Sequence, residues 1–188
     1  MDKQSFENLK QVILTKLLTE KEKEYYCHVQ FVSSIGSELA KTCKVNKSLV
    51  ETACLLHDIG RDFEIKNEDH GDAGERISKD ILHQSGFTFQ EQKLILKCIK
   101  NHCKELPPEK LSVEERIIIT ADSASKVLFH EAFTLLCKKQ TYSEKLEWAK
   151  KYLEKGYKNI LFSDYKTSIE SRYRIIKNIY EAVGTKKQ

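Results

Sequence analysis

The segment ACLLHDIGR, residues 53–61, places a histidine and an aspartate at the end of an apolar run and follows them with glycine and arginine. A helix that buries this run carries His57 and Asp58 inward with it. An imidazole and a carboxylate cost free energy in an apolar interior unless something pairs with them. The segment therefore raises the question of what pairs with the two side chains.

The composition favours a helical globular protein. The 188 residues include seven Gly and two Pro, and 32% are charged. This length suffices to bury one sizeable core. No apolar run reaches the roughly 20 residues of a membrane span, and the first residues lack a signal-peptide core. We expect a cytoplasmic protein, and we expect its six cysteines, which form no CxxC pair, to be reduced and buried.

Apolar residues recur at helical spacing along the whole chain. Asn46 and Thr88 are expected to cap two helices, SVEE at 112–115 fits a capping box, and Gly60 is expected to close the helix that contains His57. The pattern predicts helices around residues 6–17, 28–39, 50–57, 77–82, 94–102, 117–127, from Ser143 to near Gly156, and over about 165–183.

These helices predict an all-α fold, a compact single-domain helical bundle. We expect residues 1–24 to form an N-terminal helix packed on the core, residues 25–137 to form the core, and residues 138–188 to add basic C-terminal helices to the same globular unit. The last segment holds 13 Lys or Arg against six Asp or Glu. It could face an anionic ligand or nucleic acid, but a solvated helix surface is the favoured interpretation.

Four polar residues lie on predicted apolar helix faces: His28, His57, Asp58 and Asp122. Asp122 follows RIIITA, so a lone carboxylate there would be buried at a cost of several kcal/mol. Convergence of the four groups on one divalent cation removes all of these costs together. Two imidazoles and two carboxylates suit Mn, Fe, Co, Ni, Mg or Zn, and no thiolate ligand is implied.

The same residues resemble the H…HD…D motif of the HD-domain superfamily of metal-dependent phosphohydrolases. The contexts CHVQFVSSIGSELA, LLHDIG and ITADSASK match as well, and the resemblance covers roughly residues 25–130. It implies an all-α bundle with the metal site at its centre. His70 and His102 are similar to two further histidines that bind a second metal in some branches, where the pair's aspartate, here Asp58, bridges the ions.

One or two ions are therefore expected. With a single ion, His70 and His102 would instead contact substrate or cap helices. His83 and His130 match nothing in the pattern.

The expected activity is attack of metal-bound hydroxide on a phosphate ester or anhydride of a nucleotide or other small phosphorylated metabolite. Asp58 would orient the nucleophile or take its proton. Arg61 and Lys126 are the candidates to stabilise the developing charge, although each could instead form a surface ion pair. No separate organic cofactor is expected.

Three alternatives remain open at this point. The chain could be a symmetrical dinucleoside tetraphosphate hydrolase, although the residues after LLHD and the loop before His70 depart from that pattern. It could be a di-iron HD oxygenase, or a non-catalytic nucleotide-binding module. We expect a small phosphorylated partner, preferably a nucleotide, with neither a membrane nor a nucleic-acid partner favoured. The sequence does not determine the oligomeric state.

Overall fold

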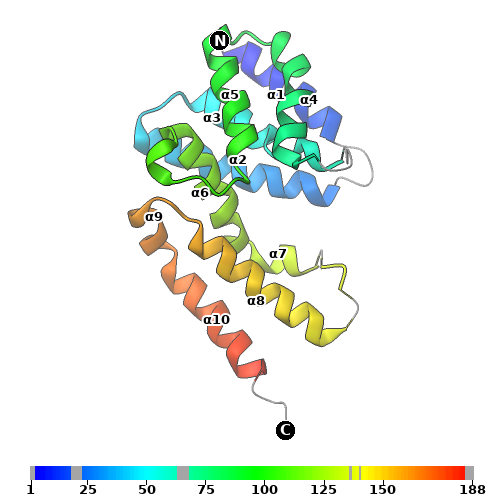
Figure 1. The fold of residues 1–188 in the computed structure, drawn as a ribbon, viewed down its shortest axis with the longest axis vertical. Coiled ribbons are helices and arrows are strands. Elements are labelled where there is room, and N and C mark those ends of the chain that lie inside the picture. The colour runs from blue at the N-terminus through cyan, green and yellow to red at the C-terminus, as the bar shows by residue number, and fades with distance from the viewer. Residues whose placement is uncertain (1–2, 18–22, 63–67, 136, 140, 185–188) are drawn as a thin grey trace. The chain divides into compact units, whose positions relative to one another are not determined.

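The computed structural model describes residues 3–17, 23–62, 68–135, 137–139 and 141–184, and these residues form ten α-helices and two short 3₁₀ helices without a strand (Figure 1). The predicted all-α class is confirmed. In chain order the elements are α1 (Lys3–Leu17), α2 (Lys23–Cys43), α3 (Lys47–Leu56), η1 (Ile59–Asp62), α4 (His70–His83), α5 (Phe89–Asn101), η2 (Pro108–Lys110), α6 (Val113–Leu128), α7 (His130–Leu135), α8 (Tyr142–Lys158), α9 (Ser163–Ser168) and α10 (Glu170–Gly184).

Local capping fixes where several helices begin. The Asn46 side chain accepts from the Leu49 N–H at the start of α3, and Thr88 forms a complete capping box with Glu91 at α5. Ser112 and Glu115 exchange the same pair of bonds before α6. Each bond satisfies a backbone N–H that the helix leaves without a partner. All three predicted caps are confirmed.

Residues 1–121 form one compact unit. Within it α2 packs on α3 and α4 packs on α5, while α3 also contacts α5 (Figure 1). The core contains fully buried apolar side chains from α2, α3, α5 and the first part of α6, among them Val32, Leu55, Leu56, Ile99 and Ile118. This core fixes the ends of α3, α4 and α5 that hold the candidate site.

Residues 122–188 form the second unit, so the boundary falls inside α6. Here α8 packs on α10, and the rings of Tyr157 and Tyr173 stack 3.9 Å apart. The subdivision at residues 24 and 137 stays a prediction. Among the described helices, none is both long and apolar enough to cross a bilayer.

Three local predictions differ from the structure. The helix α8 begins at Tyr142, after its cap Thr141 in a capping box with Glu144, and therefore one residue before the predicted start at Ser143. The helix expected over about 165–183 is two helices, α9 and α10. Gly60 does not close α3, whose C-cap is His57. A Cβ on Gly60 would lie 2.1 Å from the His70 carbonyl oxygen, so glycine is required for η1 to approach α4.

Candidate metal centre

Two histidines from neighbouring helices face one another in the core of the first unit. His28 lies on α2 and shares its buried face with Val32 and Leu39, as the spacing predicts, and His57 is the fully buried C-cap of α3. Their Nε2 atoms are 3.2 Å apart. His57 Nδ1 lies 2.7 Å from the Cys54 carbonyl oxygen, which can only accept, so Nδ1 carries the proton and Nε2 presents a lone pair when the ring is neutral.

A second pair of histidines is built in the same way from α4 and α5. His70 is the first residue of α4, directly after its N-cap Asp69, and His102 is the C-cap of α5. Their Nε2 atoms are 3.1 Å apart. His102 Nδ1 lies 2.6 Å from the Ile99 carbonyl oxygen, three residues earlier, which repeats the relation between His57 and Cys54.

Asp58 lies between the two pairs and offers one carboxylate oxygen to each. Its Oδ1 is 3.2 Å from His102 Nε2 and 3.4 Å from His70 Nε2. Its Oδ2 is 3.5 Å from His57 Nε2 and 3.6 Å from His28 Nε2. The structure thus brings together five of the six predicted ligands, in two groups that share the carboxylate.

Arg61, which is expected to stabilise the developing charge, contacts Asp58 directly. Its Nε lies 2.7 Å from Asp58 Oδ2, while about half of the Arg61 side chain stays exposed. The arginine therefore pairs with the buried carboxylate from a half-exposed position.

The electrostatics favour an ionised carboxylate at Asp58 and a less readily protonated ring at His70. Burial alone would raise the pKa of Asp58, but His57, the hydrogen bonds to His102 and His28, and Arg61 outweigh it and hold that pKa well below its usual range. Burial, with the positive charge of Arg61, lowers the pKa of His70. Metal ions bind these same protonation states, so the cluster is prepared for a cation.

The donor atoms also fit divalent ions in spacing. Two nitrogen ligands of one Zn²⁺, each 2.0–2.1 Å from it, lie roughly 2.9–3.4 Å apart in octahedral or tetrahedral arrangements. The two histidine pairs, at 3.1 and 3.2 Å, fall in this range. The His/Asp cluster therefore suits a divalent metal, while the identity of the metal and the role of each ligand stay predictions.

Asp122 and Lys126 lie on α6 at the start of the second unit. Asp122 is buried, and its carboxylate accepts a hydrogen bond from the Lys126 ammonium one turn later. Their roles as ligand and as charge-stabilising residue stay predictions.

Cys103 is a candidate ligand that the sequence analysis did not select. It groups with His70 and His102 as a possible metal-binding set. The expectation that the cysteines are buried is wrong for most of them, since only Cys54 and Cys98 are buried and Cys27 is exposed. The sequence signal that could have selected Cys103 was its position directly after the predicted ligand His102.

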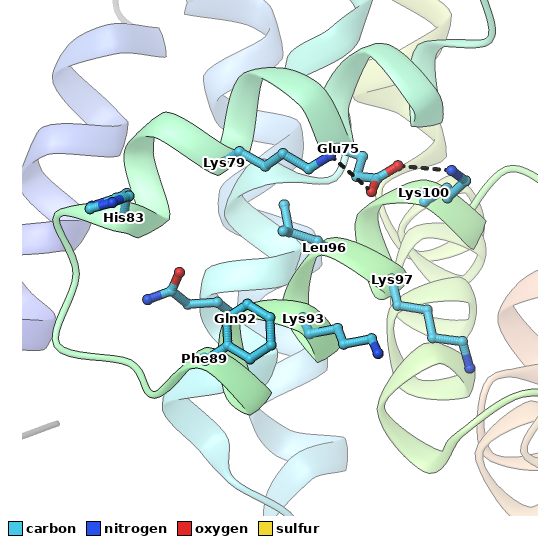
Figure 2. Close-up of a pocket in the computed structure, with 9 residues that line it drawn as sticks. All are labelled: Glu75, Lys79, His83, Phe89, Gln92, Lys93, Leu96, Lys97 and Lys100. Atoms are coloured by element: carbon cyan, nitrogen blue, oxygen red, sulfur yellow. Dashed lines mark hydrogen bonds and ion pairs between the residues drawn. The ribbon is translucent and has the colours of Figure 1, made fainter.

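A groove of 790 Å³ between α4 and α5 contains none of the predicted ligands (Figure 2). Leu96 and Phe89 contribute apolar walls, and Glu75 forms ion pairs with Lys79 and Lys100. A large apolar pocket is the usual first candidate for a ligand site. Here the cluster of potential metal ligands lies elsewhere in the same unit.

The sequence comparisons match this chain to a known family. The family model of the HD domain matches residues 25–126. Ribonuclease Y of Borrelia garinii is 35% identical over 98 residues, which are 52% of this chain and 18% of that protein. The chain therefore matches less than a fifth of the length of this relative.

Two solved structures have a similar fold. YpgQ of Bacillus subtilis, solved in complex with ADP, aligns with a TM-score of 0.67 at 13% identity, and a Bacillus thuringiensis HD-superfamily hydrolase aligns with a TM-score of 0.66 at 20% identity. Each alignment covers 96% of this chain and 93% of the other. The predicted HD-type helical fold is confirmed.

Proposed function

The chain belongs to the HD domain family, and from this premise we propose that it is a metal-dependent phosphohydrolase acting on a nucleotide or other small phosphorylated metabolite. The observation that supports this most strongly is the position of Asp58, with one carboxylate oxygen facing His28 and His57 and the other facing His70 and His102. Such a set would hold two divalent ions with Asp58 shared between them.

Divalent ions bound here would supply Lewis-acid activation of water and neutralise phosphate charge. The chain's own residues supply the orientation. The carbonyl oxygens of Cys54 and Ile99 hold His57 and His102 with their Nε2 atoms toward Asp58. Because the pKa of Asp58 is low, its carboxylate is better suited to accept a hydrogen bond from the attacking water than to remove its proton.

Arg61 has two roles in this proposal. Its Nε–H holds Asp58 Oδ2, and its guanidinium, on a half-exposed side chain, would also bind phosphate oxygens of the substrate. Lys126 stays a second candidate for the same charge. The complex of YpgQ with ADP supports a nucleotide as the substrate class.

A second candidate substrate is an RNA phosphodiester. The relatives called ribonuclease Y, from three Borrelia and Borreliella strains, favour it. The same water activation would serve either phosphorus centre, so the two candidates differ in the substrate and not in the metal centre.

The test is a panel of nucleotides, phosphorylated metabolites and short RNA oligomers incubated with Mn-, Mg-, Co- or Fe-loaded protein, with phosphate, diphosphate and RNA fragments measured. We expect turnover by the wild type and its loss in Asp58→Ala, with Asp72→Asn as a control that alters a partly exposed acid on α4, paired with Lys100 and Lys104. No turnover with any metal, together with unchanged metal binding by Asp58→Ala, would overturn the proposal. A coloured iron form whose absorbance responds to O₂ would favour the oxygenase alternative instead.

A further inference from the structure

The thiol of Cys103 lies at the edge of the second histidine pair. Its Sγ and one ring nitrogen each of His70 and His102 all lie within 4.8 Å of one another. The corresponding group around His28, His57 and Asp58 contains no cysteine among the described residues. The two halves of the cluster therefore differ in one soft donor.

The contact between α4 and α5 holds this thiol in place. Cys103 follows directly on the C-cap of α5, and its Sγ donates to Asp69 Oδ1 at 2.9 Å. Asp69 also accepts from the Gly71 N–H and so caps α4. A Cβ on residue 71 would lie 2.5 Å from the Lys100 carbonyl oxygen and 3.0 Å from Cys103 Sγ, so glycine allows the two helix ends to come this close.

We propose that Cys103 is an additional, thiolate ligand of the ion held by His70, His102 and Asp58, and that it makes this half of the centre selective for a borderline-soft cation such as Zn²⁺ or Co²⁺. This inference rests on the proposed metal centre. Thiolate prefers such ions over Mg²⁺ and Mn²⁺, which favour oxygen. The half built from His28, His57 and Asp58 lacks sulfur and would discriminate less against hard ions.

Binding of the metal ion by Cys103 needs no oxidant or reductant. The S–H bond breaks, the sulfur–metal bond forms, and the proton passes to Asp69 Oδ1, which already accepts that hydrogen and is exposed enough to release it to water.

The experiment uses the full-length, reduced protein stripped with a chelator and titrated with Co²⁺. Visible bands report cobalt at the His/Asp cluster, and a near-ultraviolet charge-transfer band reports a cobalt–thiolate bond. We expect both in the wild type. Cys103→Ser should lose the charge-transfer band, keep the visible bands and bind Zn²⁺ at least about tenfold more weakly at one site. Cys27→Ser, which alters an exposed cysteine, should behave as the wild type.

The outcomes separate the two proposals. Visible bands without a charge-transfer band in the wild type, or a charge-transfer band that persists in Cys103→Ser, would overturn the role of Cys103 and leave the metal centre standing. Absence of bound cobalt in the wild type would overturn both. A measurement free of substitutions checks the result: Zn²⁺ should slow alkylation of wild-type Cys103 by iodoacetamide and leave Cys27 unchanged, as followed by peptide mass spectrometry.

Discussion

The helices α4 and α5 arrange charge in two contrasting ways. In the groove between them, three lysines pair with carboxylates of the chain itself: Lys79 and Lys100 with Glu75, and Lys97 with Glu115. These lysines are about half exposed. At the candidate metal centre, the buried Asp58 carboxylate faces four imidazoles, and the Nδ1 atoms of His57 and His102 are each turned to a backbone carbonyl oxygen.

The difference shows what a cation would contribute. In the groove, each of these three lysines already has a carboxylate partner, and water solvates the exposed parts of their side chains. The candidate metal centre instead gathers four imidazoles around one largely buried carboxylate, and both kinds of group are ligands of divalent cations. We infer that the groove is stable as it is, whereas the centre gains stability when a metal binds.

The largest expected effect is on metal affinity, and it distinguishes the carboxylate of the candidate metal centre, Asp58, from that of the groove, Glu75. Asp58→Ala should weaken binding of Mn²⁺ or Zn²⁺ by at least about 100-fold, because both histidine pairs lose a shared ligand. Glu75→Ala, which removes the carboxylate at the centre of the lysine-lined groove, should leave metal affinity unchanged. Isothermal titration calorimetry measures both. Equal losses in the two variants would contradict the contrast between the regions.

Removal of metal should destabilise the protein only because ions are lost from the candidate metal centre. Free metal at 100 times its Kd stabilises a folded state by about 2.7 kcal/mol if the unfolded chain does not bind it. Chelation should therefore lower the Tm of the wild type and of Glu75→Ala. Thermal unfolding of Asp58→Ala should respond little, and a full response in that variant would place the stabilising ion elsewhere.

At the groove, the pair formed by Lys97 and Glu115 should act without metal. Glu115 is buried and also accepts from Asn101, so Glu115→Ala should cost about 1.5–3 kcal/mol of unfolding free energy. Urea unfolding in the presence of chelator measures it. Glu115→Gln, which keeps the shape and part of the hydrogen bonding, should cost less, and an equal cost would point to charge alone.

Ionisation of Glu115 should also make the free energy of unfolding depend on pH. Burial would raise the pKa of Glu115, but Asn101, the Ser112 N–H and Lys97 together lower it. A lowered folded-state pKa means that ionised Glu115 contributes its full stability above the unfolded-state pKa and loses it as the pH falls through the folded-state pKa. The stability difference between wild type and Glu115→Gln should therefore shrink on acidification below about pH 4.3. A difference that stays constant in this range would contradict the assignment.

The smallest effect is expected for Lys93, which lines the groove and forms no ion pair among those found in the described residues. Lys93→Ala should change the unfolding free energy by less than about 0.5 kcal/mol and leave metal binding unchanged. A larger loss of stability would show that the groove is held together by more than its carboxylate–lysine pairs.

Much of the local structure was predictable from the sequence because its causes are local. The caps at Asn46, Thr88 and Ser112 depend on bonds to residues three positions later, which the sequence displays directly. The predicted start of a helix at Ser143 was one residue late, because Thr141 and Glu144 form a capping box and α8 begins at Tyr142. The division into α9 and α10 has no comparable signal.

The sequence by itself determined which polar residues enter the interior. His28 lies on an otherwise apolar helix face, and His57 and Asp58 follow directly on the apolar run that ends α3, so burial of these segments carries them inward. Only the tertiary structure decided that Asp58 is shared by two histidine pairs and that Cys103 lies beside one of them. These relations depend on how closely the ends of α3, α4 and α5 approach, which is set by packing between helices and by glycines that leave room for a neighbouring backbone. Spacing along a chain contains no measure of that distance.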